Sequence, residues 1–373
     1  MSAVLEADAL PERTSRIGPR LWIRIVIACV AGAWGVGIVL TVGANTNDPL
    51  THFARDFDQF WYGAYALREG INPYSVIGPG KAFDWPWPLY FPLPATLIAL
   101  PFSFLPVIAA RAAFFGGSSA LLAFALTRDS YHRLVVFAST GYFFAGRVAQ
   151  WEVALTAAAL IPSIGFVFAA KPNIAIALLA AYPRKRAFIG IAVITGLSLV
   201  VMPSWPAHWL SLVNDASDKA PPVSYAAGIF LPLALLRWKR PEARLIAVLA
   251  FIPHTLMPYA TIPLFLVPAT LLESLLLVWA TWIARVLVST GMGPFTNFSD
   301  FHAAMATVFL PLVYLPVLVM VLRRPNEGEA PDWIVRGLRT LRPRRRDHNE
   351  VAPDGTSHAE EGRRSNRKPG PGA

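Results

Sequence analysis

Residues Leu21 to Val42 read LWIRIVIACVAGAWGVGIVLTV, a stretch in which Arg24 is the only charged side chain. A transmembrane helix needs about 20 mostly apolar residues to cross the hydrocarbon core, so this stretch is long enough to span. Because it follows an arginine-bearing segment, a cleaved signal peptide is a second interpretation. No small-residue cleavage site follows it, and many further apolar runs do. We therefore interpret it as a retained first helix with its N-terminus in the cytoplasm.

The composition of the whole chain extends this interpretation. Of its 373 residues, 55% are apolar and only 15% are charged, against about 25% charged in an average soluble domain. This balance excludes a soluble globular enzyme and a disordered protein, and indicates an all-α, polytopic, integral membrane protein. The single cysteine, Cys29, allows neither an intrachain disulfide nor a cysteine metal cluster. Further apolar runs lie at roughly 89–106, 107–127, 134–146, 152–170, 172–183, 187–202, 223–238, 244–260, 262–285 and 303–322.

The net charge of +10 comes from basic clusters between the apolar runs. This pattern favours positive-inside topology over nucleic-acid binding. It divides the chain into a cytoplasmic segment (1–20), a transmembrane domain (21–322) and a disordered basic cytoplasmic tail (323–373). Outer loops are expected at about 44–88 and 203–222, both on the same side. Since an odd number of spans would leave the tail outside, we expect an even number, about 10–12, in the cell membrane.

The first outer loop contains the group of residues that most strongly indicates a chemical function. Phe60, Trp61, Ala64, Tyr65 and Leu67 recur at helical spacing, which predicts an amphipathic helix along the membrane surface.

Two carboxylates, Asp56 and Asp58, stand just before this helical pattern. A carboxylate at a membrane-facing cleft can act as a general base toward a sugar hydroxyl. The alternative is an aspartate that caps the start of the helix. The match of Asp56-Phe57-Asp58 to Asp-x-Asp is too short to decide between the two.

This loop resembles the first periplasmic loop of glycosyltransferase family 87, which comprises GT-C-type, polyprenol-dependent mannosyl- and arabinosyltransferases. The resemblance rests on Asp56-Phe57, the aromatic and alanine-rich helix, and Gly70-Ile71-Asn72-Pro73-Tyr74. It extends from about residue 20 to 322, although Leu93 splits the double proline typical of the family. The other segments that resemble the family are Leu89–Pro94, Ala169–Pro172, Pro203–Pro206 with His208-Trp209, and Pro253–Tyr259.

The resemblance implies a GT-C-like helical bundle and a concrete reaction. The donor would be a polyprenyl-phosphate sugar, and the acceptor a glycolipid or glycan at the outer face. An outer-loop aspartate, Asp56 or failing that Asp58, would deprotonate the acceptor hydroxyl, and the single displacement would invert the anomeric centre. Mannose and arabinose are the sugars expected. No cofactor and no metal is required, because fixed donors can stabilise a lipid monophosphate leaving group.

Five residues are candidates for binding the substrate or its lipid phosphate: Arg147, Gln150, Lys171, His254 and Tyr259. Arg147 can instead be a positive-inside anchor, and Lys171 a snorkelling lysine at a helix end. A lone histidine is more often a satisfied structural residue, which is the alternative for His254.

Four aromatic residues of the first outer loop are candidates for stacking on sugars: Trp61, Tyr62, Trp85 and Trp87. An aromatic belt at the membrane interface is the alternative interpretation of the Trp85-Pro86-Trp87-Pro88 segment.

Two other functions compete with sugar transfer. Glu273, in the middle of an apolar run, favours a transporter or lipid flippase, since an intramembrane carboxylate is a functional candidate by default. A non-catalytic membrane scaffold would leave Asp56 and Asp58 dispensable. Glu152 follows Trp151 at a helix start, where the macrodipole favours a carboxylate, and we assign it no catalytic role.

Overall fold

The computed structural model describes residues 18–42, 56–215, 220–291 and 298–328. The chain divides into two compact units, Met1–Ala330 and Pro331–Ala373, and all described residues belong to the first. The expectations for the N-terminal segment and for the tail therefore fall almost entirely outside the described residues.

The described part of the chain is built of helices, with one small sheet of two parallel strands. The α-helices are α1 (Gly18–Val42), α3 (Asp56–Arg68), α4 (Pro73–Val76), α5 (Leu93–Ala99), α6 (Val107–Leu126), α7 (Thr140–Val148), α8 (Glu152–Leu160), α9 (Pro172–Ala181), α10 (Lys185–Val201), α11 (Trp205–Asp215), α12 (Pro241–Phe251), α13 (Leu271–Gly291), α14 (Phe298–Phe309) and α15 (Leu315–Leu322). The 3-10 helices are η1 (Leu100–Phe104), η2 (His132–Ala138), η3 (Pro162–Ala170), η4 (Pro222–Ser224), η5 (Gly228–Arg237) and η6 (Pro258–Leu266); η7 (Leu310–Tyr314) is a π-helix, and the strands are β1 (Ile77–Gly78) and β2 (Phe83–Asp84).

Four helical segments are long and apolar enough to cross a membrane. They are Leu21–Thr41 in α1, Val107–Leu126 in α6, Leu271–Gly291 in α13, and Ser299–Leu322, which combines α14, η7 and α15. A fifth candidate arises if α10 and α11, bent by 105°, are counted together. The helical architecture expected from the composition is thus confirmed, and the four candidate spans are compatible with a polytopic membrane protein. The count of about 10–12 spans stays a prediction.

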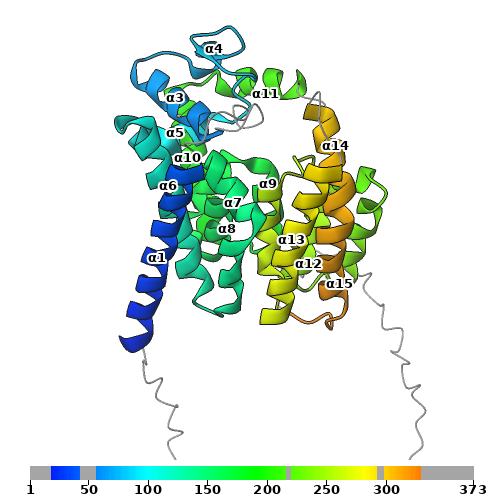
Figure 1. The fold of residues 1–373 in the computed structure, drawn as a ribbon. Coiled ribbons are helices and arrows are strands. Elements are labelled where there is room, and N and C mark those ends of the chain that lie inside the picture. Colours follow the sequence, from blue (N-terminus) through cyan, green and yellow to red (C-terminus); the bar gives the residue numbers. More distant parts are fainter. Residues whose placement is uncertain (1–17, 43–55, 216–219, 292–297, 329–373) are drawn as a thin grey trace, which may run out of the picture. The chain divides into compact units, whose positions relative to one another are not determined.

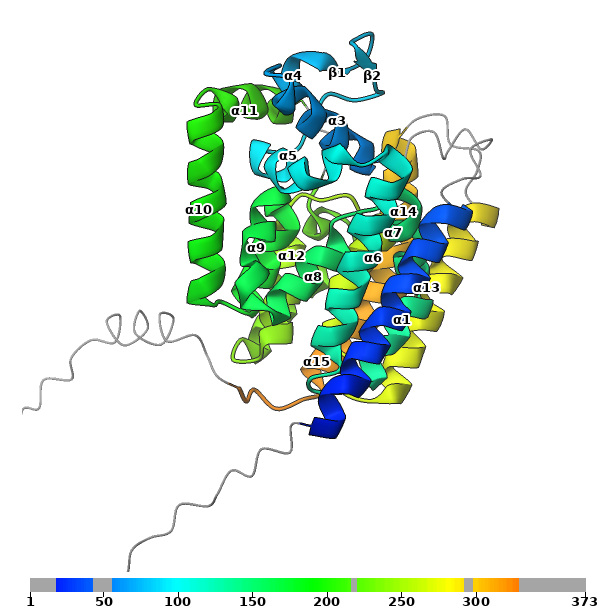
Figure 2. The ribbon, with the colours of Figure 1, turned by 90° about the vertical axis from the view of Figure 1, so that its left-hand side faces the viewer.

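Small residues bring α1 and α6 together side by side (Figures 1 and 2). A Cβ at Gly116 would stand 2.7 Å from the Val36 side chain, and one at Gly35 would stand 2.7 Å from Ser119 Oγ. The Ser119 hydroxyl also lies 2.7 Å from the Tyr142 hydroxyl, which joins α7 to this pair. Close backbone approach through small residues is typical of membrane helix pairs.

The described part of the segment predicted as the first outer loop, residues 56–88, forms a layer of short elements at one end of the long helices (Figures 1 and 2). The helix expected in this loop is confirmed as α3. Its residues Phe57 and Phe60 are fully buried, with Phe57 against Phe102 and Phe60 against Trp151. Because α3 buries one face against protein, it is fixed over the helix bundle.

The segment predicted as the second outer loop contains a helix, α11, which we did not expect from its Trp- and Pro-rich sequence. Trp205 joins a buried cluster with Tyr74 and Trp85 of the first loop. Trp209 Nε1 donates a hydrogen bond to the Tyr90 carbonyl at 2.9 Å. These contacts bring the two segments together at the same end of the bundle.

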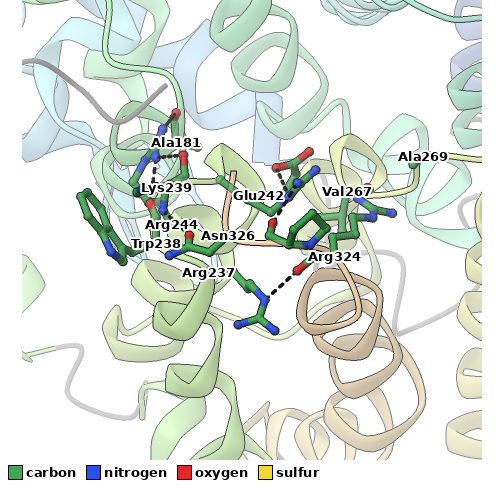
Figure 3. Close-up of polar contacts among 12 residues, drawn as sticks. Ala181, Arg237, Trp238, Lys239, Glu242, Arg244, Val267, Ala269, Arg324 and Asn326 are labelled. Atoms are coloured by element: carbon green, nitrogen blue, oxygen red, sulfur yellow. Dashed lines mark hydrogen bonds and ion pairs between the residues drawn. The ribbon is translucent and has the colours of Figure 1, made fainter. Parts of the chain in front are cut away.

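The opposite end is held by arginines that donate to carbonyls at helix C-termini (Figure 3). Arg244 donates to the carbonyls of Ala180 (2.8 Å) and Ala181 (2.9 Å) at the end of α9. Arg324 donates to the Val267 carbonyl at 2.7 Å, after η6. The last carbonyls of a helix have no partner within the helix, so these arginines both satisfy them and complement the helix dipole.

Glu273 belongs to this same end, so the expectation of a carboxylate in the middle of a span is wrong. The apolar run predicted at 262–285 is interrupted after η6, and Glu273 lies in the first turn of α13. Its carboxylate accepts from the Ala269 N–H at 2.7 Å and pairs with Arg324 at 2.5 Å. It therefore caps a helix N-terminus and ties it to α15.

Candidate functional site

A polar cluster lies where α3, the α7–α8 link and the start of α9 meet. Its members are Asp56, the first residue of α3; Gln150, between α7 and α8; Glu152, the first residue of α8; and Lys171, just before α9. We call these four residues the Asp56 cluster. Gln150 Nε2 donates to Asp56 Oδ2, and Lys171 Nζ donates to Gln150 Oε1 at 3.3 Å and to Glu152 Oε1 at 2.6 Å.

The backbone before Gln150 adopts an unusual conformation that builds the link. Ala149 has φ 49° and is the one non-glycine residue with positive φ among those described. A left-handed conformation costs an ordinary residue about 1–2 kcal/mol. The reversal it makes ends α7 and lets the Gln150 N–H donate to the Ala145 carbonyl at 2.9 Å. Strain of this kind is concentrated at functional sites.

Lys171 reaches the cluster because the apolar run predicted at 152–170 is not one helix. It breaks at Ile161 into α8 and η3, which pack against each other. The chain thereby returns, and the two ends of the run, Glu152 and Lys171, become neighbours. We expected no catalytic role for Glu152, only a favourable position at a helix start. The signal that could have revealed it is the opposite charge at the two ends of one apolar run.

Tyr259 and His254 border the cluster from the segment that includes η6. Lys171 Nζ lies 4.9 Å from the centre of the Tyr259 ring, a cation–π distance. The Tyr259 hydroxyl lies 3.3 Å from Thr255 Oγ1. His254 is 1% exposed, with Nδ1 2.8 Å from the Ile252 carbonyl and Nε2 without a hydrogen-bond partner in the described part of the chain. The structure thus brings together Asp56, Gln150, Lys171 and Tyr259, with His254 within electrostatic reach of Lys171.

Asp58 is engaged elsewhere. Its two carboxylate oxygens accept from Nε (2.6 Å) and Nη2 of Arg111 on α6, and both side chains are buried. A bidentate arginine pair of this kind is strong and geometrically specific. Of the two aspartates expected as the base, Asp56 is therefore the one in the multi-residue cluster.

The charges of the cluster bear on the expected phosphate ligands. Lys171 is paired with Glu152, and it also donates to Gln150, which in turn donates to Asp56. Its positive charge is thus already matched by the protein. Arg147, half-buried in the last turn of α7, is one turn from Gln150 along the chain.

The four aromatic residues expected to stack on sugars have different surroundings. Tyr62 is 37% exposed and stacks on Phe83 with ring centres 3.8 Å apart, and Phe83 in turn stacks on Trp85. Trp61 donates Nε1 to backbone carbonyls of Phe102 and Leu105. Trp87 is half-buried. The stack around Phe83, which the sequence did not predict, is thus one exposed aromatic surface of this loop.

The buried Tyr74 supports this loop from below. The Tyr74 hydroxyl donates to the Phe91 carbonyl at 3.1 Å, and Lys81 Nζ donates to the backbone carbonyl of Tyr74 at 2.8 Å. Burial raises the pKa of Tyr74 above its ordinary value, so the phenol keeps its proton and remains a donor.

No family model, no curated protein and no solved structure matches the chain. Within the described ranges, no group of three or more His, Cys, Asp and Glu side chains is arranged to hold a metal ion.

Proposed function

We propose that the protein is an integral-membrane glycosyltransferase. It moves a sugar, mannose or arabinose, from a polyprenyl-phosphate donor to a glycolipid or glycan acceptor at the outer face of the cell membrane. One observation carries the proposal. Asp56, Lys171 and Tyr259, which lie on separate segments that resemble glycosyltransferase family 87, meet in one cluster with Gln150. The chemistry this predicts is proton abstraction at a membrane surface.

In the proposed reaction, the Asp56 carboxylate takes the proton of the acceptor hydroxyl. The acceptor oxygen then attacks the anomeric carbon as the bond from that carbon to the donor phosphate oxygen breaks. The polyprenyl phosphate leaves with the electron pair, and the anomeric centre is inverted. We assign stabilisation of the leaving phosphate to Arg147, a candidate in the last turn of α7.

The test is transfer of labelled sugar by the purified full-length protein. Labelled polyprenyl-phosphate mannose and arabinose are supplied with a membrane lipid extract as acceptor, in the presence of a chelator. Wild type should form product, and Asp56→Asn should reduce the rate by about 100-fold or more, since general-base catalysis contributes about 10²–10⁴-fold. Asp84→Asn is the matched control, because Asp84 is an exposed outer-loop carboxylate bonded to Gly80 N–H. If wild type consumes neither donor, the proposal fails.

The competing function, a transporter or lipid flippase, was motivated by Glu273. Because Glu273 caps a helix N-terminus and pairs with Arg324, it no longer favours that function. Wild-type proteoliposomes that move a labelled lipid between leaflets but transfer no sugar would establish the competing function instead.

A further inference from the structure

The hydrogen bonds of Gln150 fix the orientation of its side-chain amide. Two donors, Lys171 Nζ (3.3 Å) and the Trp151 N–H (3.0 Å), meet Oε1, and the Asp56 carboxylate meets Nε2. A flipped amide would place its NH2 group against two donors and its oxygen against a carboxylate. The partners therefore allow one orientation, in which the amide donates to Asp56.

The ammonium group of Lys171, which donates to the Gln150 amide oxygen, is itself held in place by neighbouring side chains. Glu152 is fully buried and binds Lys171 Nζ at 2.6 Å, while Gln150 is 1% exposed and Lys171 is 9% exposed. Tyr259 covers the ammonium group from another side. Because water scarcely reaches these groups, removing one of them is not compensated by solvent.

We propose that Glu152, Lys171 and Gln150 form a positioning relay for Asp56, in which Lys171 acts through Gln150 and not as a ligand of the donor phosphate. Glu152 fixes the ammonium group, the ammonium group fixes the amide oxygen, and the amide N–H group holds one carboxylate oxygen of Asp56. The relay keeps that carboxylate ionised and oriented, with its acceptor oxygen Oδ2 anchored. The role of Asp56 as a base rests on the proposed function, but its ionisation does not.

Other ionisable groups surround Asp56 and bear on its ionisation. Tyr259 interacts with it electrostatically from η6, and His254 interacts with Lys171. Arg147 lies on α7, and Asp58 on α3 is paired with Arg111. All of these groups keep their identity in the variants that test the relay.

The test is a pH titration of the Asp56 carboxyl in the full-length protein, followed by its infrared C=O band. The band is assigned with 13C-labelled aspartate and by subtraction of Asp56→Asn, and no sugar donor is added. Gln150→Met should move the midpoint of Asp56 protonation upward by about one pH unit or more, because it removes a donor that favours the charged form. The paired variant Glu152→Gln with Lys171→Met should move it upward by less, since the Trp151 N–H remains. Lys171→Arg keeps a cation that can contact both Gln150 and Glu152, so its midpoint should equal that of wild type.

Glu69→Gln is the control, because Glu69 forms an exposed ion pair with Arg68 at 3.5 Å, away from the cluster. It should leave the midpoint unchanged. The paired variant is used because Glu152→Gln alone would leave a buried, unpaired ammonium group; if the pair does not fold, Gln150→Met alone decides the test. A midpoint that stays at the wild-type value in Gln150→Met overturns the relay. Absence of sugar transfer by wild type overturns the proposed function alone, because the titration does not depend on a donor.

Discussion

Asp58 on α3 and Arg111 on α6 form a buried, doubly hydrogen-bonded ion pair that fastens the outer layer to the helix bundle. Their side chains are 8% and 9% exposed. The neighbouring aromatic contacts of Phe57 with Phe102 and Phe114 surround the same junction. Since Asp56 lies two residues before Asp58, the pair also sets the position of the candidate base.

Arg111→Met should strongly destabilise the protein. It leaves the Asp58 carboxylate buried without its partner, a change that costs about 3–5 kcal/mol. Thermal unfolding in detergent should show a large loss in the single variant. Asp58→Leu combined with Arg111→Met removes both charges and should recover most of that loss. Equal losses in the single and the double variant would contradict a coupled pair.

Two glycines of α10 give a matched pair of substitutions. A Cβ at Gly190 would stand 2.8 Å from the Phe166 backbone nitrogen, whereas a Cβ at Gly196 would meet nothing within 4 Å. Gly190→Ala should therefore separate α10 from η3 and destabilise the protein by about 1–3 kcal/mol. Gly196→Ala should stabilise it by about 0.5–1 kcal/mol, because alanine is the better helix former. Unfolding midpoints of the two variants should shift in opposite directions, and a shared direction would refute the close approach.

Sequence patterns located those parts of the fold that depend on local properties. The apolar runs at Leu21–Val42 and 107–127 became α1 and α6, and the aromatic periodicity after Asp56 became α3. Each of these features is set by residues close together in the chain, such as the length of an apolar segment or a helical repeat. These helices could therefore be predicted from the sequence alone.

Other features depend on how distant segments meet and could not be read in this way. The break at Ile161 turns one predicted apolar run into two helices, and only this return brings Lys171 to Glu152. The pairing of Glu273 with Arg324 likewise joins residues 51 positions apart. A buried charge in a sequence shows that a partner is needed, but the partner is chosen by tertiary packing.

Glu273→Gln should leave sugar transfer unchanged and lower stability modestly. Glu273 accepts from the Ala269 N–H and pairs with Arg324, and its side chain is 22% exposed. Loss of a partly exposed charge at a helix N-terminus costs about 0.3–1 kcal/mol at low ionic strength, so the unfolding midpoint should fall slightly. Arg324→Ala should cost more, because Arg324 also donates to the Val267 carbonyl. A Glu273→Gln protein that folds normally but has lost all activity would instead place this carboxylate in the mechanism.

The exposed stack of Tyr62 on Phe83 predicts a contact with the sugar acceptor. Tyr62 is 37% exposed on the outer layer, so Tyr62→Ala removes a ring face that is open to a ligand. An aromatic contact contributes about 0.5–1.5 kcal/mol beyond the area it buries, which corresponds to a rise in KM for the acceptor of about 2- to 10-fold with little change in kcat. Tyr65→Ala is the control, because Tyr65 is similarly exposed, at 41%, on the same helix but stacks on Trp61. Steady-state transfer with varied acceptor distinguishes the two, and an equal rise in KM in both variants would show that the Phe83 stack has no special role.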